Sequence, residues 1–177
     1  ALSRLLCADP AHQGLEMWLT EFPPQPRPPA RDVGVGPDLQ RDAGGLPRAP
    51  RHEPPSSWGI HYSDATEPEE CWRVLRQTGK SIGFESLAHV PAYSSWLATQ
   101  DWTDAYERHR QNLQLIGLND QDKRWVLKNP PSHLIALDAL MEVYPDALVV
   151  MTQREPVTSV ASACSLSAEA TGGHSTT

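Results

Sequence analysis

The amino-acid sequence predicts an α/β fold in which helices flank a parallel sheet. Two short apolar runs, "WVLK" at 125–128 and "ALVVMT" at 147–152, are typical of strands covered on both faces. A helical pattern lies between these runs, and another follows the later run. Strands and helices that alternate through short loops favour a parallel strand pair joined by a right-handed crossover.

Composition is that of a globular protein with one domain. The chain has 177 residues, of which 39% are hydrophobic and 21% charged, and its net charge is -7. This balance argues against a general nucleic-acid binder, which needs clustered Lys and Arg. No apolar run approaches the roughly 18 residues of a membrane span and no signal peptide is visible, so we expect no transmembrane segment.

The cysteines favour a reducing environment. Cys7, Cys71 and Cys164 are odd in number, widely separated and part of no metal-binding pattern. We interpret them as free thiols that pack as small apolar residues. The expectation is a cytoplasmic protein without a bound metal.

The residue pattern in the first third of the chain predicts two short helices followed by an irregular stretch. Residues 1–8 have helical spacing that Asp9-Pro10 stops, and residues 14–21 form a second helical piece. Ten of the 17 prolines fall within residues 22–57, where periodic apolar residues are almost absent. Such a stretch cannot bury enough surface to offset its ordering entropy, so we expect it to be irregular or disordered.

Helices are predicted again from residue 66. Thr66 and Glu69 form a capping-box pattern before a helix that Gly79 ends. A short helix over 91–98 precedes a longer one over 102–116. The buried stripe expected of the longer helix consists of Trp102, Tyr106, His109, Leu113 and Ile116.

The last third carries the strand and helix alternation. The helix between the two apolar runs is expected to have Ser132 as its N-cap, and the final helix to have Pro156 in its first turn. The buried stripe expected of the former consists of Leu134, Leu137, Leu140, Met141 and Tyr144. The side of the final helix expected to pack consists of Val157, Val160, Ala161 and Cys164.

A cation stands at the end of each predicted strand. Lys128 ends the first and Arg154 follows the second. Ligands of open parallel sheets bind beyond the carboxyl ends of the strands, and neighbouring strands lie roughly 5 Å apart, so both cations would flank one crevice. Two cations and two helix starts predict a phosphate or sulfate site. The alternatives are that Lys128 is a solvated strand end and that Arg154 pairs with Glu155 or Asp146.

His133 lies near the first of those helix starts. The positive end of a helix lowers the pKa of an imidazole and keeps it neutral near pH 7. A neutral imidazole can act as a general base toward an acceptor hydroxyl. The alternative is a histidine that caps the helix or packs against it.

Several stretches together resemble the bacterial sulfotransferases that use 3′-phosphoadenosine 5′-phosphosulfate as donor. They are "RWVLKNPPSHLIALDALMEVYPDALVVMTQREP" with the following "VTSVASACSL", "FESLAHVPAYSSWL" and "DAYERHRQNLQLI". The opening "ALSRLLCADP" resembles the helix that follows the phosphosulfate loop of that family. The resemblance leaves out residues 22–57, which are either a divergent insertion or an out-of-frame translation.

The resemblance implies a P-loop-like α/β fold and transfer of a sulfuryl group to an acceptor hydroxyl or amine. By analogy, Lys128 stabilises the sulfuryl group and His133 deprotonates the acceptor. Arg154 and Ser162, eight residues apart, bind the donor's 3′-phosphate, with Ser159 as the runner-up to Ser162. The donor is a co-substrate, and the resemblance implies no metal.

The acceptor side is predicted less sharply. The resemblance allows His89 and Trp96 to line an acceptor pocket, although core packing is the alternative for Trp96. The acceptor is expected to be a small molecule, a glycan or a lipid. The sequence predicts neither its identity nor the oligomeric state.

The sequence also departs from the family pattern. The phosphosulfate loop would stand before Ala1 and both ends look cut, so we expect a single partial domain over 1–177, incomplete at both ends and inactive by itself. "KNPPSH" has one residue more than the family's spacing between lysine and histidine, and Gln153 and Glu155 replace the family's usual His and Asp. The alternatives are a nucleotide or nucleoside kinase of related fold and a non-catalytic relic.

Overall fold

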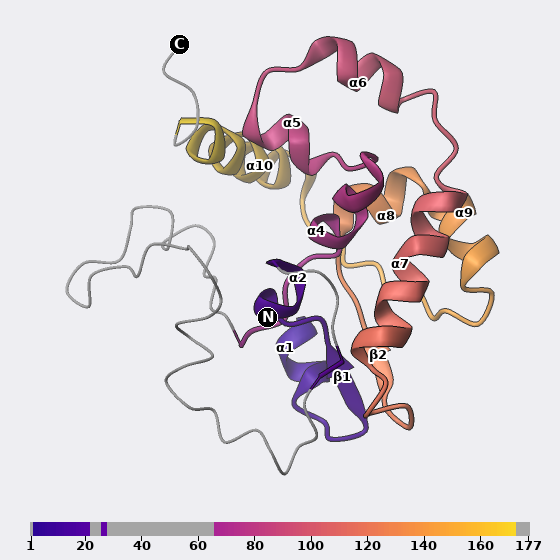
Figure 1. Cartoon of the computed structure of the whole chain (residues 1–177). Helices are drawn as coiled ribbons and strands as arrows, with labels where there is room; N and C mark the ends of the chain where they lie inside the picture. Colours follow the sequence, from indigo (N-terminus) through magenta and orange to yellow (C-terminus); the bar gives the residue numbers. More distant parts are fainter. Residues whose placement is uncertain (1, 22–25, 28–65, 173–177) are drawn as a thin grey trace.

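The computed structural model describes residues 2–21, 26–27 and 66–172 (Figure 1). The stretch expected to be irregular, 22–57, lies outside the described residues except for Pro26 and Arg27, which belong to no helix or strand. The described elements are α1 (Leu2–Cys7), β1 (His12–Gly14), α2 (Met17–Glu21), α4 (Trp72–Leu75), the 3-10 helix η2 (Arg76–Thr78), α5 (Gly83–Leu87), α6 (Pro91–Leu97), α7 (Thr103–Ile116), β2 (Arg124–Val126), α8 (Pro130–Ile135), α9 (Leu137–Val143) and α10 (Pro156–Gly172).

A parallel pair of strands flanked by helices confirms the predicted fold class. In the described part of the chain, β1 pairs with β2, and His12, Gln13 and Gly14 lie opposite Arg124, Trp125 and Val126. The strand predicted at 125–128 is therefore present as β2, but its neighbour is β1. A pairing between segments more than 100 residues apart leaves no local signal in a sequence.

The strand predicted over 147–152 is not formed. The backbone there has no regular structure, and residues 148–152 make no hydrogen bond to another described residue. Leu148 is 83% exposed and Met151 is 67% exposed. A continuous apolar run indicates a covered strand only where other strands and helices enclose it. No described element encloses this run.

Two buried clusters form the core, and α7 contributes to both. The first lies between α7 and α9 and contains Leu75, Leu97, Trp102, Ala105, Tyr106, Ala136 and Val143. The second lies between α2, α4 and α7 and contains Leu15, Leu19, Cys71, Val74, Leu113 and Ile116. All five residues of the stripe predicted for 102–116 are buried, as the helical period requires.

The predicted helix ends are correct at some positions and wrong at others. Gly79 ends η2 with a left-handed backbone, φ 76°, as expected of a glycine cap. Thr66 does not cap a helix, because α4 begins only at Trp72. Ser132 lies inside α8, whose N-cap is Asn129; a proline at the first helical position starts that helix earlier.

The helix predicted after Ser132 is divided at Ala136, where φ -115° and ψ 39° interrupt it. The interruption turns α8 relative to α9, so the single stripe predicted for both is wrong at Leu134, which is 66% exposed. Leu140 and Tyr144, later in the same stripe, do pack against the core.

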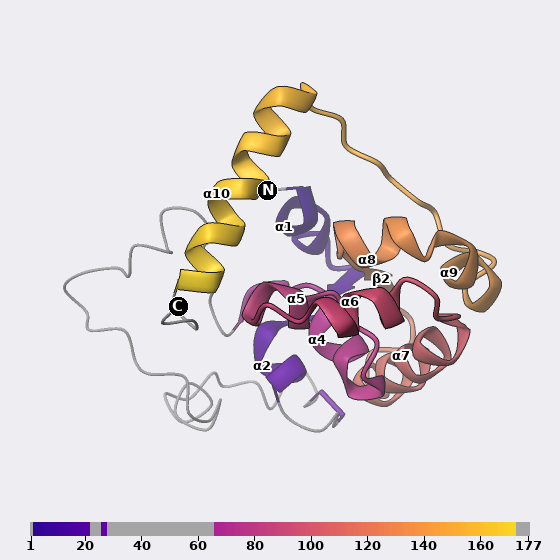
Figure 2. The ribbon, with the colours of Figure 1, turned by 90° about the horizontal axis from the view of Figure 1, so that it is seen from above.

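The final helix, α10, begins at Pro156 as predicted, but its apolar side is exposed. Val157 is 76% exposed and Val160 is 63% exposed. Figure 2 shows the extended segment after α9 passing clear of the other described helices before α10 begins. Contacts with α5 place α10 near the helical body, yet they do not cover the predicted side.

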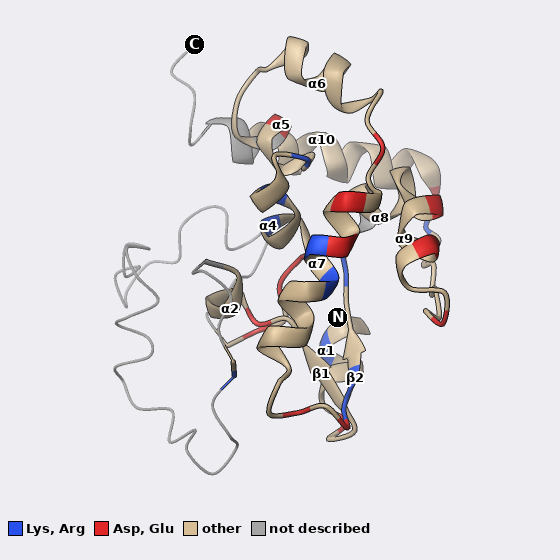
Figure 3. Ribbon diagram, turned by 45° about the vertical axis from the view of Figure 1, so that its right-hand side comes forward, with Lys and Arg blue, Asp and Glu red and all other residues tan. Residues whose placement is uncertain are grey.

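Charged side chains are mixed along the described elements. Figure 3 shows Lys and Arg interspersed with Asp and Glu on α7 and around β2. Lys80, for example, forms an ion pair with Asp104 at the start of α7. On the side of the described ribbon that Figure 3 shows, basic positions do not form a continuous stripe of the kind that follows a nucleic-acid backbone.

Candidate functional site

His133 lies on α8 against a buried tyrosine of α7. Its Nδ1 atom is 2.9 Å from Oη of Tyr106, and that oxygen is 3.5 Å from the carbonyl oxygen of Ser132. Tyr106 is fully buried, whereas His133 is half-buried. The packing of α7 thus fixes the position of the histidine that the sequence proposes as a base.

A second pair of the same kind lies beside the first. Nδ1 of His109 is 2.7 Å from Oη of Tyr144, and the rings of His109 and His133 are 6.4 Å apart. The ring of Tyr106 lies 5.8 Å from that of His133 and 6.1 Å from that of His109. We call these four residues, Tyr106, His109, His133 and Tyr144, the Tyr–His cluster.

Burial keeps both imidazoles of the Tyr–His cluster neutral at pH 7. It lowers the pKa of His133 to about 4, and burial together with the nearby His133 lowers the pKa of His109 to about 3. Burial also raises the pKa of Tyr106 and that of Tyr144, so both phenols keep their protons. The sequence predicted a lowered pKa for His133 from the helix start, whereas burial is the cause in the structure.

Three buried polar atoms near His133 lack a hydrogen-bond partner among the described residues. They are Nδ2 of Asn129, Oγ of Ser132 and Nε2 of His109. Leaving a buried polar group unpaired costs about 1–3 kcal/mol, so such groups gather where a ligand or water completes the hydrogen bonding. Unused hydrogen-bonding capacity therefore lies at the start of α8 and on the neighbouring His109 of α7.

Lys128 lies two positions before the first residue of this helix and contacts residues next to α4. Its ammonium lies 3.8 Å from a carboxylate oxygen of Glu70, and its carbonyl accepts a 2.9 Å hydrogen bond from the amide of Cys71. Both side chains of the ion pair are partly exposed, so the pair holds Lys128 weakly. The short connection from β2 to α8 thus carries both Lys128 and His133.

Arg154 and Ser162 lie in a different environment. Both are exposed, and Arg154 has no hydrogen bond or ion pair with another described residue. Glu155 does not pair with it; its carboxylate accepts hydrogen bonds from the amide and hydroxyl of Thr158, at 2.7 Å and 3.0 Å. Because 147–152 is not a strand beside β2, the expectation that neighbouring strands place Lys128 and Arg154 at one crevice is wrong.

The residues proposed for the acceptor side lie on and before α6. His89 is exposed, and Trp96 is 43% exposed with its ring 5.5 Å from that of Tyr93. Core packing, the alternative for Trp96, is therefore wrong. The described contacts do not join either residue to the Tyr–His cluster.

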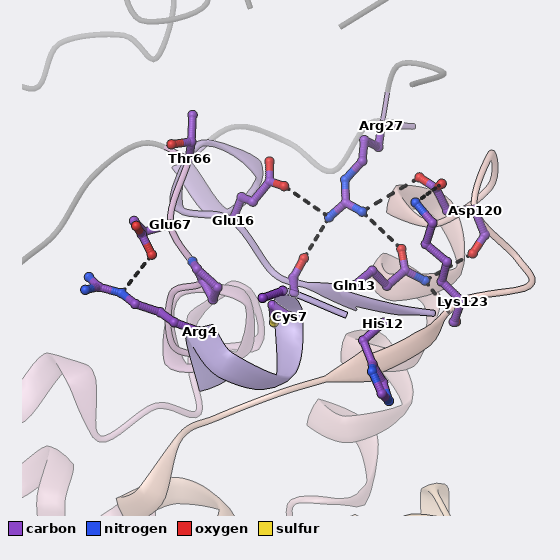
Figure 4. Close-up of a pocket in the computed structure, with 13 residues that line it drawn as sticks. Arg4, Cys7, His12, Gln13, Glu16, Arg27, Thr66, Glu67, Asp120 and Lys123 are labelled. Carbon is purple, nitrogen blue, oxygen red and sulfur yellow. Dashed lines mark hydrogen bonds and ion pairs between the residues drawn. The ribbon is translucent and has the colours of Figure 1, made fainter. Parts of the chain in front are cut away.

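A cavity of about 530 Å³ lies beside α1 and β1 (Figure 4). Arg27 is one of the residues that line it, and it donates hydrogen bonds to Gln13 at 3.1 Å and to the Gly14 carbonyl at 2.7 Å. The same guanidinium lies 3.8 Å from Glu16 and 3.7 Å from Asp120. These contacts involve both terminal nitrogens of Arg27, whereas its buried Nε has no hydrogen-bond partner among the described residues. None of the four predicted site residues lines the cavity.

The described residues contain neither a candidate metal site nor a candidate membrane-spanning helix. No three or more His, Cys, Asp or Glu side chains in 2–21, 26–27 and 66–172 are grouped to hold a metal ion. Within those same ranges, no helix has the length and apolar character needed to cross a membrane.

Comparison with known proteins identifies the family. The sulfotransferase family model matches residues 1–177. The chain belongs to the sulfotransferase family. No curated protein sequence matches it. Family membership decides against the nucleotide kinase alternative.

Two crystal structures of sulfotransferases are similar to this chain. Sulfotransferase STF1 from Mycobacterium tuberculosis is 56% identical, with a TM-score of 0.85, over 99% of this chain and 47% of that chain. Sulfotransferase STF9 from Mycobacterium avium is 28% identical, with a TM-score of 0.69, over 94% of this chain and 42% of that chain. The chain thus spans about half the length of these sulfotransferases. The match confirms the expected P-loop-like α/β fold.

Sequence reasoning missed the partners of His133. Tyr106, His109 and Tyr144 were predicted only as buried positions of helical stripes. The available signal was the polar atom that each carries inside an otherwise apolar stripe, because a buried phenol or imidazole needs a hydrogen-bond partner. Which residues pair could not be predicted, because the pairs join α7 to α8 and to the end of α9.

Proposed function

We propose that this sulfotransferase-family chain carries the acid–base part of a site that transfers a sulfuryl group from 3′-phosphoadenosine 5′-phosphosulfate to an acceptor hydroxyl or amine. The observation that carries the proposal is the half-buried, neutral imidazole of His133, which Tyr106 holds at the fourth residue of α8, the helix that follows the connection bearing Lys128. A base that is neutral at pH 7 can accept a proton there.

In the proposed reaction, His133 takes the proton of the acceptor as the acceptor atom attacks sulfur. The bond between sulfur and the bridging oxygen of the donor breaks, and that oxygen leaves with adenosine 3′,5′-bisphosphate. Negative charge develops on the leaving oxygen, and the ammonium of Lys128 neutralises it. Its weak ion pair with Glu70, at 3.8 Å, leaves Lys128 able to turn toward this charge.

Arg154 and Ser162 are the proposed ligands of the donor's 3′-phosphate. The support is that the guanidinium of Arg154 is exposed and without a partner among the described residues. An arginine in that condition can give both of its fork hydrogen bonds to a phosphate. Ser159, the runner-up to Ser162, is half-buried in the first turn of α10.

We also propose that the 177-residue chain is inactive by itself in sulfuryl transfer. Arg154 and Ser162 are exposed, and no described contact holds them against His133. Catalysis by positioning is lost when one part of a site is not held at the reacting geometry. A chain retaining no donor affinity at all is the second candidate, a non-catalytic relic.

Fewer residues support the proposed acceptor and the proposed location. The acceptor is a small molecule, a glycan or a lipid, and the exposed His89 and Trp96 are offered as residues that contact it. A cytoplasmic location is supported by three separated cysteines, an odd number that suits reduced thiols.

Thermal unfolding with adenosine 3′,5′-bisphosphate tests the donor site without requiring turnover. At one hundred times its dissociation constant, a ligand stabilises a protein by about 2.7 kcal/mol, which raises Tm by roughly 5–10 °C at this chain length. Arg154→Ala should lose most of that shift. Arg108→Ala is the matched control, because Arg108 is also exposed and donates a 3.4 Å hydrogen bond to Gln111.

The outcomes separate the candidates. A shift that Arg154→Ala removes and Arg108→Ala keeps supports the proposed donor site. No shift at millimolar bisphosphate overturns it and favours the relic. An assay of sulfuryl transfer from labelled donor tests the proposed inactivity, and a rate near 1 per second or faster, within the ordinary range of enzymes, contradicts it.

A further inference from the structure

The phenol of Tyr106 contacts two atoms with different hydrogen-bonding abilities. One is Nδ1 of His133, at 2.9 Å, which can donate or accept according to the tautomer. The other is the carbonyl oxygen of Ser132, at 3.5 Å, which can only accept. The phenol has a single proton, so the two contacts are not independent.

A single arrangement of protons satisfies both contacts. If Tyr106 donates its proton to the Ser132 carbonyl, its oxygen accepts an N–H from Nδ1 of His133. In the opposite arrangement, Tyr106 donates its proton to Nδ1 of His133, and no hydrogen lies between the phenol oxygen and the Ser132 carbonyl. The first arrangement makes two hydrogen bonds and the second makes one, which favours the first.

The first arrangement frees the other ring nitrogen of His133. Nε2 makes no hydrogen bond to a described residue, and it is not among the buried polar atoms that lack a partner, so it retains access to solvent. With the proton on Nδ1, the lone pair is on this accessible atom.

We propose that Tyr106 is a positioning residue that holds His133 as the Nδ1–H tautomer and so makes Nε2 the atom that accepts the acceptor's proton. The reaction in which Nε2 takes a proton rests on the proposed function. The tautomer of His133 does not depend on it. A tautomer held before the substrate arrives removes one reorganisation step from proton transfer.

A buried phenol suits this role because it does not compete for the proton. Burial raises the pKa of Tyr106, so the phenol stays neutral while it accepts the N–H. A carboxylate in its place would stabilise imidazolium strongly and make His133 a stronger base that releases its proton less readily. Tyr106 is also 0% exposed, so the packing of α7 fixes the direction of the hydrogen bond.

The second pair of the Tyr–His cluster supplies a matched control. His109 and Tyr144 make the same kind of contact at 2.7 Å, but His109 is 1% exposed and its Nε2 is buried. That histidine cannot reach a substrate in solution. Tyr144→Phe therefore removes an equivalent hydroxyl from the same cluster without touching His133.

The test is the tautomer of His133, measured in the full 177-residue protein at pH 7.5. Long-range ¹H–¹⁵N spectra of protein labelled at histidine distinguish a protonated ring nitrogen from an unprotonated one. His133 should show a protonated Nδ1 and an unprotonated Nε2. Tyr106→Phe should move His133 toward the Nε2–H form, whereas Tyr144→Phe should leave His133 unchanged and alter His109.

The outcomes are decisive and independent of the donor. An Nε2–H tautomer of His133 in the unmodified protein overturns the proposal, and so does an unchanged tautomer in Tyr106→Phe. Far-UV circular dichroism confirms that both phenylalanine variants fold. If the tautomer behaves as expected while adenosine 3′,5′-bisphosphate fails to bind, the proposed function fails and the assignment of Tyr106 stands. If the bisphosphate binds but the tautomer does not respond, only Tyr106 loses its role.

Discussion

The Tyr–His cluster and the segment from 147 to 162 differ in how the chain supports them. Tyr106 and His109 are at most 1% exposed, and each bonds a side chain from another part of the fold. Leu148, in contrast, is 83% exposed, and Arg154 has no partner among the described residues. Both regions carry residues of the proposed site. Packing therefore positions the acid–base residues of the proposed site, whereas the proposed phosphate ligands have no comparable support in the described structure.

The largest expected difference between the regions is in stability. Tyr106→Ala removes a fully buried ring that packs in the cluster between α7 and α9, and should lower the free energy of unfolding by about 3–5 kcal/mol. Leu148→Ala, at an 83% exposed position, should change it by less than about 0.5 kcal/mol. Urea unfolding of both variants measures the difference. Equal losses would show that 147–152 is packed as firmly as α7.

The second effect is a loss of stability in acid that comes from the Tyr–His cluster. His133 and His109 have folded pKa values of about 4 and about 3, below the ordinary value of about 6.5. Between pH 6.5 and 4 the unfolded chain therefore binds more protons than the folded chain. Above pH 6.5 both histidines are neutral in the folded and in the unfolded chain, and the protein has its full stability. As the pH falls below 6.5, the free energy of unfolding should decrease by about 1.4 kcal/mol per pH unit for each histidine.

Urea unfolding at pH 7.5, 6 and 5 measures this slope. His133→Asn should remove about half of the slope that the two histidines contribute, because one of the two titrating groups is gone. A slope that does not change in this variant would show that His133 titrates in the folded protein as it does in the unfolded chain.

The third effect concerns the exposed region. A charge-assisted pair with a phosphate contributes about 1.5–3 kcal/mol, so Arg154→Ala should weaken binding of adenosine 3′,5′-bisphosphate roughly 10- to 150-fold. The same variant should leave the urea midpoint unchanged, because Arg154 is exposed and makes no hydrogen bond or ion pair with a described residue. Calorimetric titration measures the affinity. A lower midpoint together with unchanged affinity would make Arg154 a structural residue.

The smallest effect is expected at Lys128. Its ion pair with Glu70 is 3.8 Å long and partly exposed, and such pairs contribute about 0–1 kcal/mol. Lys128→Met keeps the apolar stem and should therefore reduce the free energy of unfolding by less than about 1 kcal/mol. A loss above 2 kcal/mol in urea unfolding would mean that Lys128 is held by the fold and is not available to a substrate.

The sequence predicts features that depend on neighbouring residues better than those that depend on distant ones. The buried stripe of α7, from Trp102 to Ile116, follows from the helical period, and the start of α10 follows from Pro156. The pairing of His12 with Arg124 could not be predicted in this way, because the two segments meet only in the tertiary structure. For the same reason 147–152 has the pattern of a covered strand although no described element covers it.

The candidate site divides along the same line. His133 could be proposed from its place after β2 and from the family resemblance. The phenol that orients it could not be proposed, because Tyr106 is 27 residues earlier in the chain. Arg154 could be proposed from its place after an apolar run. The exposure of Arg154 could not be predicted, because it depends on whether other elements cover the apolar run at 147–152.

Hydrogen exchange with and without adenosine 3′,5′-bisphosphate tests most directly the claim that only one half of the site is held by the fold. In the protein alone, amides of α7 should be protected, whereas those of 148–155 should exchange near the rate of an unstructured peptide. The bisphosphate should slow exchange around Arg154 and Ser162 and leave α7 unchanged. Strong protection of 148–155 without ligand, or no response of this segment to saturating ligand, would contradict the account.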